Sequence, residues 1–236
     1  VMKKEFNIDL NQANYFAGHS LGEYSALTCA NSLPFEEAVC LLYARGKFMQ
    51  EAVPSGRGAM LAVLGLKVEE ILEQINSIST NGTCEIANDN SPGQIVVSGD
   101  KDSIQILQNS LKKKSIRGLI LPVSAPFHCS LMESAEKKMS QKITELIFKN
   151  PKPSIISNVT AKAENKASKI KELLIKQITS RVNWRESIEY MINNGVNEFI
   201  EIGPGKVLTG LVRRINKDVN VFNINSIDDI TNYINK

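Results

Sequence analysis

The stretch Tyr15-Phe16-Ala17-Gly18-His19-Ser20-Leu21-Gly22-Glu23-Tyr24-Ser25-Ala26-Leu27 joins a short apolar run to a segment of helix-forming composition. Its centre is a G-x-S-x-G pattern, with one glycine before and one after Ser20. Because glycine has no Cβ, the chain can turn sharply there, and a serine between a strand and a helix projects its hydroxyl from the carboxyl edge of a sheet. The pattern therefore predicts a nucleophile elbow. A glycine-bounded loop with a capping serine is the alternative.

The composition of the 236 residues is that of an ordinary soluble protein, with 42% hydrophobic and 22% charged residues. No apolar run approaches the ~18 residues that a membrane span needs, and no signal peptide is visible. The net charge of +3 is small and the lysines are scattered. We therefore expect neither a nucleic-acid-binding surface nor membrane association.

The four cysteines, Cys29, Cys40, Cys84 and Cys129, lie far apart and never in C-x-x-C spacing. Because the chain also has only two histidines, a structural zinc site is not expected. Isolated cysteines are typical of reduced thiols, so the sequence predicts a cytoplasmic protein with no metal ion.

Hydrophobic periodicity predicts an inserted unit between Gly58 and Val123. The expected elements are a strand at 59–64, a helix at 68–78, strands at 83–87 and 94–98, a helix at 104–111 and a strand at 118–123. The segment 88–93 is dense in turn formers and is expected to join the two middle strands. The order β-α-β-β-α-β is that of a ferredoxin-like unit.

The rest of the chain has the pattern of an α/β layer fold. Strands are expected at 13–17, 154–159 and 197–202, and helices at 22–31, 35–53, 131–148, 168–180, 184–194 and 205–216. We therefore expect a discontinuous core domain over residues 1–54 and 125–236 and a small domain over 55–124. The chain would leave the core through 54–58 and return through 124–128, with a ligand cleft between the two units.

A serine hydroxyl needs a base to become a nucleophile, and that base is most often histidine. His19 is adjacent to Ser20, so on a strained turn its side chain should point away from the reactive side of the serine. His128 lies at the return from the insert, where a loop facing the cleft is expected. His128 is therefore the candidate base, and a satisfied structural histidine is the alternative.

Five motifs occur in order along the chain: Gly18 to Leu27, Arg45-Gly46, Asn90-Ser91-Pro92-Gly93-Gln94, Pro126 to Met132, and Glu201 to Leu208. Together they resemble the bacterial malonyl-CoA:acyl carrier protein transacylase family over about residues 10–217. The resemblance implies an α/β-hydrolase-like core with a parallel sheet and an inserted ferredoxin-like (βαββαβ) small domain.

The resemblance also implies roles for the residues that match the family's catalytic positions. Ser20 matches the serine that forms the malonyl ester, and His128 matches the catalytic histidine. Arg45 matches the arginine that binds the malonyl carboxylate. Its chemistry suits that role, because a planar guanidinium can bind a carboxylate through two parallel charge-assisted hydrogen bonds.

Further positions follow from the same resemblance. Gln177 matches a glutamine whose main-chain carbonyl orients the histidine, and Leu21 would supply an oxyanion N–H. Asn88, Asn90 and Gln94 match polar positions that line the cleft from the small domain. Turn chemistry accounts for the two asparagines about equally well.

One departure concerns the start of the chain. The family opens with a strand and a Gly-Gln-Gly-Ser-Gln loop whose glutamine supplies a second oxyanion N–H, and this sequence begins at Val1, downstream of that point. Loss of one such donor costs on the order of 100-fold or more in rate. We therefore expect a truncated chain, an incomplete gene product or a chain whose first segment is absent.

The sequence thus predicts ping-pong transfer of malonyl from malonyl-CoA to the phosphopantetheine thiol of acyl carrier protein, in fatty-acid biosynthesis, by a monomer without a cofactor of its own. A polyketide-type acyltransferase with another acyl group is one alternative. A plain serine esterase is a second, although it would have no use for a buried Arg45. A truncated, non-catalytic fragment that binds acyl-CoA or carrier protein is a third.

Overall fold

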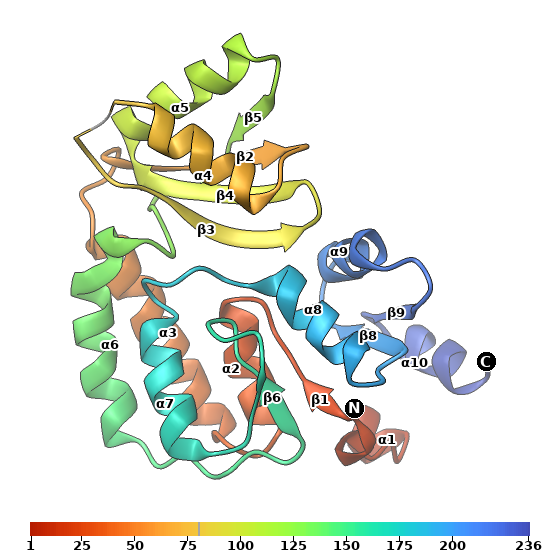
Figure 1. Cartoon of the computed structure of the whole chain (residues 1–236). Coiled ribbons are helices and arrows are strands. Elements are labelled where there is room, and N and C mark those ends of the chain that lie inside the picture. The colour runs from red at the N-terminus through yellow and green to blue at the C-terminus, as the bar shows by residue number, and fades with distance from the viewer. Residues whose placement is uncertain (80) are drawn as a thin grey trace.

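The smaller unit of the fold is a four-stranded antiparallel sheet with helices on one face (Figure 1). It is seen in the computed structural model, which describes residues 1–79 and 81–236. Its elements are β2 (Gly58–Leu64), α4 (Val68–Ser77), β3 (Cys84–Ser91), β4 (Gln94–Asp100), α5 (Lys101–Lys113) and β5 (Arg117–Ile120). The strand order β3-β4-β2-β5, with antiparallel neighbours throughout, is that of a ferredoxin-like unit. The predicted βαββαβ fold is confirmed.

Alternation along β2 gives this sheet two buried faces. Leu61 and Val63 point toward the helices and pack with Leu107 of α5, among other apolar residues. Met60, which directly precedes Leu61, points to the opposite face, where the partly buried Phe127 packs in the same cluster as Met60. Phe127 also contacts the core of the larger unit, so the two units share packing at this residue.

The prediction of a turn at 88–93 is wrong for most of this segment, because residues 88–91 form part of a strand. Asn88, Asp89 and Asn90 belong to β3, which continues to Ser91, and only Pro92 and Gly93 separate β3 from β4. The register of β3 shifts on both sides of the asparagine-rich segment, as in β-bulges. Asn88 also forms a bridge to Val182 of the larger unit, so a tertiary partner overrides the local turn preference.

The larger unit is built around two short parallel strand pairs. β1 (Tyr15–Phe16) pairs with β6 (Ser154–Ile156), which also pairs antiparallel with β7 (Ala163–Glu164). The helices beside this sheet are α2 (Leu21–Cys29), α3 (Phe35–Glu51), α6 (Glu133–Glu145), preceded by η2 (Ser130–Met132), and α7 (Ala167–Lys176). Their apolar faces form one buried cluster with Ile155 of β6. The predicted α/β fold class is therefore confirmed.

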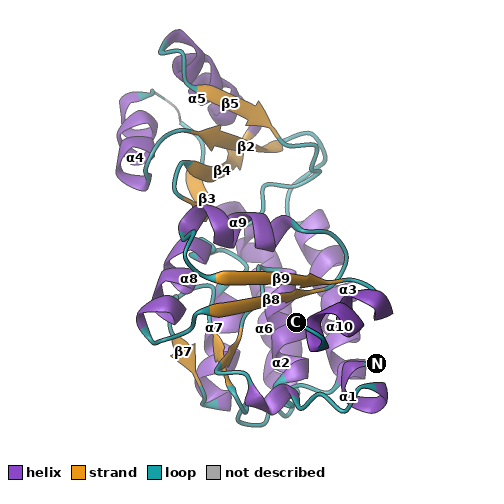
Figure 2. Cartoon of the chain, turned by 90° about the vertical axis from the view of Figure 1, so that its right-hand side faces the viewer, coloured by secondary structure: helices purple, strands orange, loops and turns teal. Residues whose placement is uncertain are grey.

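The second parallel pair lies close to the C-terminus (Figure 2) and packs in one apolar cluster with Tyr15 of β1 and Ile156 of β6. It consists of β8 (Glu198–Ile202) and β9 (Asn220–Ile224), packed with α8 (Trp184–Asn193) and α9 (Val207–Ile215). Five elements are absent from the sequence-based prediction: β7, β9, α1 (Met2–Glu5), η1 (Leu10–Gln12) and α10 (Ile227–Ile234). None of the helices in the described ranges is long and apolar enough to cross a bilayer.

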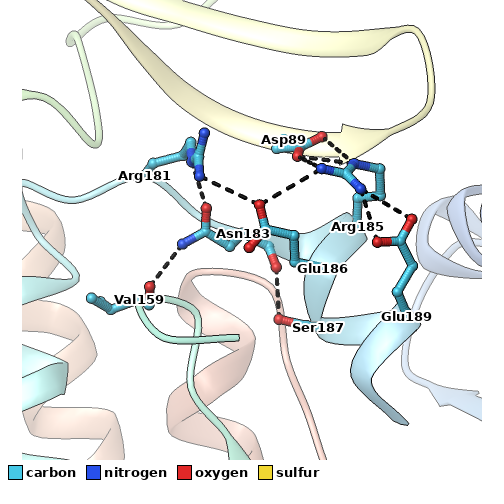
Figure 3. A network of polar contacts seen from close by, with 8 residues as sticks. All are labelled: Asp89, Val159, Arg181, Asn183, Arg185, Glu186, Ser187 and Glu189. Carbon is cyan, nitrogen blue, oxygen red and sulfur yellow. Dashed lines mark hydrogen bonds and ion pairs between the residues drawn. The ribbon is translucent and has the colours of Figure 1, made fainter. Parts of the chain in front are cut away.

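Main-chain and ionic contacts connect β3 to the segment before α8. The Asp89 N–H donates to the Val182 carbonyl at 3.0 Å, and the Val182 N–H donates to the Ala87 carbonyl at 2.8 Å. The carboxylate of Asp89, which is 1% exposed, lies 2.8 Å from Arg185 Nη2 and also accepts from Arg185 Nε (Figure 3). Arg185 in turn contacts Glu189 on the same helix. The arginine therefore compensates a buried charge of the smaller unit.

Arg185→Met is expected to lower the free energy of unfolding by about 3 kcal/mol, because Asp89 would stay buried without its cation. Arg181→Met is the matched control. Arg181 pairs at 3.5 Å with Glu186, which is exposed, and donates to Asn183, but it compensates no buried charge, so a smaller loss of about 1 kcal/mol is expected. Chemical denaturation measures both values, and equal losses would contradict the assignment.

Candidate active site

Ser20 lies at a sharp turn between β1 and α2, with φ 53° and ψ −105°. A positive φ is uncommon for a residue other than glycine, so its neighbours must stabilise the turn. Asn158 does so by accepting a hydrogen bond from the Ser20 N–H at 2.6 Å and donating one to the Gly18 carbonyl at 2.8 Å. The chain also passes close to itself, because a Cβ on Gly18 would lie 2.0 Å from the Gly22 carbonyl oxygen. The turn therefore requires glycine at position 18.

His128 and Arg45 both contact the hydroxyl of Ser20. Ser20 Oγ lies 2.7 Å from His128 Nε2, and Arg45 Nη2 donates to the same oxygen at 2.9 Å. His128 Nδ1 lies 2.9 Å from the main-chain carbonyl oxygen of Gln177. A carbonyl can only accept, so Nδ1 carries the proton of the neutral ring and Nε2 accepts from the serine. This is the geometry of a nucleophile, a base and a group that orients the base.

Burial sets the charge states at this site. Burial, with the positive charge of Arg45 as the second cause, lowers the pKa of His128 to about 3, against the opposing hydrogen bond to Gln177. His128 is therefore neutral at pH 7 and free to accept a proton. Burial also lowers the pKa of Arg45, but a guanidinium starts so high that it stays charged.

The first turn of α2 presents the Leu21 N–H beside Ser20. In the described part of the chain this N–H donates no hydrogen bond, as is usual for the first residues of a helix. An unpaired donor at the positive end of a helix is suited to stabilise a developing oxyanion.

The predicted cleft residues of the small domain stand apart from this cluster. Asn90 Oδ1 lies 2.8 Å from His19 Nε2, and the His19 ring packs near Trp184. Gln94 accepts a hydrogen bond from Arg214 of α9, and Asn88 is buried where β3 meets Val182. Within the described ranges, neither Asn88 nor Gln94 bonds to Ser20, Arg45 or His128, whereas Asn90 bonds to the neighbour of Ser20.

Two residues near Ser20, Asn158 and Glu23, are not among the positions that the sequence predicts for this site. Asn158 follows β6, whose parallel partner β1 leads to Ser20, so its place at a strand end was an available signal. Glu23 lies on the helix face that also carries Leu27 and Ala30, all three of which are 1% exposed or less. A charged residue in that apolar register was the signal for Glu23.

A cavity of about 400 Å³ lies at the boundary between β3 and α6. It is lined by Glu85, Ser130, Glu133, Glu136, Lys137 and Thr179. Ser130 donates to Glu85 through its N–H at 3.0 Å, so the two units also contact each other here. Among residues 1–79 and 81–236, no three His, Cys, Asp or Glu side chains are grouped to hold a metal ion.

Residues 11–230 match the family described as acyl transferase domain. The malonyl CoA-acyl carrier protein transacylase of Escherichia coli (strain K12) is 44% identical over 200 residues, which make up 84% of this chain and 65% of that protein. The chain thus spans less than two thirds of that relative. The crystal structure of acyl-carrier-protein-S-malonyltransferase from Bartonella henselae is similar with a TM-score of 0.95 and 39% identity, over 99% of this chain and 75% of that chain.

A further similar structure is a type II PKS acyl-carrier protein in complex with its malonyl-transacylase. The TM-score is 0.91 and the identity 38%, over 94% of this chain and 72% of the matched chain.

Gly18→Ala is expected to lower the free energy of unfolding by about 3 kcal/mol, because the added Cβ overlaps the main chain of Gly22. Gly22→Ala is the matched control. A Cβ there meets nothing within 4 Å, and alanine favours the helix by up to about 1 kcal/mol. Denaturant melts of the two variants measure the difference, and a tolerated Gly18→Ala would contradict the account of the turn.

The neutral, buried His128 predicts a pH dependence of stability. Its folded pKa of about 3 lies below the unfolded value of 6.5, so the unfolded chain binds more protons between these values. The stability that His128 contributes is therefore present above pH 6.5 and is lost as the pH falls toward 3. We therefore compare the unfolding free energies of wild type and His128→Asn. Their difference, wild type minus variant, should decrease as the pH falls from 6.5 toward 3, by up to about 1.4 kcal/mol per pH unit. A constant difference would show that His128 is not buried as a neutral ring.

Proposed function

This chain belongs to the acyl transferase domain family, and on that premise we propose that it transfers malonyl from malonyl-CoA to the phosphopantetheine thiol of acyl carrier protein in fatty-acid biosynthesis. One observation carries the proposal: a buried guanidinium, Arg45, donates to the hydroxyl of a serine that is paired with a neutral histidine. The names of the relatives support the choice of malonyl and of a carrier protein.

In the first half-reaction, Ser20 takes the malonyl group from CoA. Its hydroxyl proton passes to His128 Nε2 while Oγ forms a bond to the thioester carbonyl carbon. The oxyanion that forms would lie near the Leu21 N–H. The carbon–sulfur bond then breaks, and the CoA thiolate receives the proton from His128. The product is a malonyl ester on Ser20 and free CoA thiol.

Arg45 would select a carboxylated acyl group. In malonyl, one methylene separates the carboxylate from the thioester carbonyl, so a carboxylate partner must stand very close to the nucleophile. Arg45 meets that condition, because its Nη2 is 2.9 Å from Ser20 Oγ.

In the second half-reaction, the phosphopantetheine thiol gives its proton to His128 and attacks the ester carbonyl. Ser20 leaves and takes the proton back, which restores the starting pair. These steps are proton transfers and exchanges of an acyl group, so they use no metal or redox cofactor. The phosphopantetheine group is carried by the partner protein. The setting we propose is the cytoplasm, with a monomer that contacts neither nucleic acid nor a membrane.

The proposal is tested by incubating the protein with malonyl-CoA or acetyl-CoA and measuring the ester on Ser20 by intact-mass spectrometry. A malonyl adduct is expected in wild type and none in Ser20→Ala. Arg45→Ala should slow malonylation by about 10- to 100-fold, the value of hydrogen bonds to a charged group. Acetylation serves as the internal control, because acetyl has no carboxylate for Arg45 to bind.

The possible results separate the alternatives. Acetylation as fast as malonylation in wild type would contradict the role of Arg45 and favour another acyl group. Rapid hydrolysis of the adduct without transfer to carrier protein would favour an esterase. Binding of acyl-CoA without any adduct would favour a non-catalytic fragment.

A further inference from the structure

Glu23 is a buried acid three residues after the reactive serine. It lies in the first turn of α2 and is 1% exposed. A carboxylate is rarely buried so completely unless other groups compensate it. Its Oε2 accepts from Gln177 Nε2 at 2.7 Å and from the Asn158 N–H at 3.2 Å. Both partners belong to the site.

Gln177 connects Glu23 to the base and to the arginine. Its main-chain carbonyl accepts from His128 Nδ1, and its Oε1 accepts from Arg45 Nη2 at 3.2 Å. The amide nitrogen of the same side chain donates to Glu23 and to the Ser20 carbonyl at 3.1 Å. Because Nε2 is bound to Glu23, the amide is oriented with Oε1 toward Arg45.

Asn158 connects Glu23 to the nucleophile. Its N–H donates to Glu23, while its side chain accepts from the Ser20 N–H and donates to the Gly18 carbonyl. The positive φ of Ser20 therefore depends on a residue whose own main chain is bound by Glu23.

The titratable groups that face Glu23 come from three elements: Arg45 of α3, Tyr24 of α2 and Glu164 of β7. Burial raises the pKa of Glu23 to about 7, against the hydrogen bonds from Gln177 and Asn158 and the positive charge of Arg45. Glu23 thus changes charge near neutral pH. A protonated carboxyl is a weaker acceptor than a carboxylate, so its two partners are bound most firmly above this pH.

We propose that Glu23 is a positioning residue for acyl transfer at Ser20, which aligns His128 and Arg45 through Gln177 and the Ser20 main chain through Asn158. The inference deepens the proposed function and rests on it. Glu23 acts only through its two partners.

Glu23→Gln tests the inference, because glutamine has nearly the same shape and lacks the charge. The rate of Ser20 modification is measured by intact mass with two reagents, malonyl-CoA and an alkyl fluorophosphonate. With the fluorophosphonate, Ser20 Oγ forms a bond to phosphorus, fluoride leaves and the hydroxyl proton passes to His128. Both rates should fall by about 10- to 100-fold at pH 8, the cost of a misaligned catalytic group. Circular dichroism verifies that the variant is folded.

The pH profile distinguishes positioning from a merely structural role. In wild type, the labelling rate should fall as the pH drops through about 7, where Glu23 takes up a proton. Burial lowers the pKa of His128, so its own inflection is expected at lower pH, and an inflection caused by His128 would persist in Glu23→Gln. Glu23→Gln should lack the inflection. Glu164→Gln is the matched control: Glu164 acts on Glu23 only through its charge and makes no hydrogen bond to Gln177 or Asn158, so it should keep the inflection and a rate within about twofold.

Two results would overturn the inference: a Glu23→Gln variant that is labelled at the wild-type rate, or a wild-type profile without an inflection near pH 7. The second applies even if the variant does not fold. A wild-type protein that reacts with fluorophosphonate but is never malonylated contradicts the proposed function instead, and the labelling rates still decide the role of Glu23.

Discussion

The close approach of Gly18 to the main chain of Gly22 determines where Ser20 stands. A Cβ at position 18 would overlap the main chain of Gly22, and glycine has none. The chain can therefore reverse between β1 and α2, with the Ser20 side chain at the outside of the turn. Glycine only permits this path, however. The positive φ of Ser20 persists because Asn158, far along the sequence, binds both sides of the turn. The position of Ser20 thus depends both on the small residue Gly18 beside it and on hydrogen bonds from the distant Asn158.

Desolvation acts on the three ionisable groups around this turn in different directions. It lowers the pKa of His128, which leaves a neutral base, and it raises the pKa of Glu23, which brings a carboxyl into the neutral range. Arg45 stays cationic and lies close to both. The site therefore holds a positive charge that faces Glu23, an acid whose pKa burial raises to about 7. Such an environment favours the arrival of an anionic ligand group at Arg45.

Most of the architecture could be predicted from the sequence, because the spacing of hydrophobic residues indicates which side chains are buried. The sequence also singled out Ser20 and His128 by their chemistry, whereas Gln177 was accessible only through family resemblance, since a main-chain carbonyl leaves no trace in residue type. The failures have physical causes. The extension of β3 through Asn88 depends on pairing with Val182, and Asn220 and Asn223 interrupt the apolar pattern of β9. Local patterns could mark Asn158 as a residue near a strand end and Glu23 as a charge in an apolar helix register, but not the tertiary contacts through which they act.

The bridge between β3 and Val182 is made of main-chain groups, so the identity of the side chains there does not decide whether it forms. Exchange of Arg185 or Asp89 changes the stability of the contact but leaves this pairing intact. A change that removes an amide hydrogen, such as proline at position 182, would break one of its two hydrogen bonds. The contact between the smaller unit and residue 182 therefore rests on two main-chain hydrogen bonds as well as on the Asp89–Arg185 ion pair, and the main-chain part does not depend on charge.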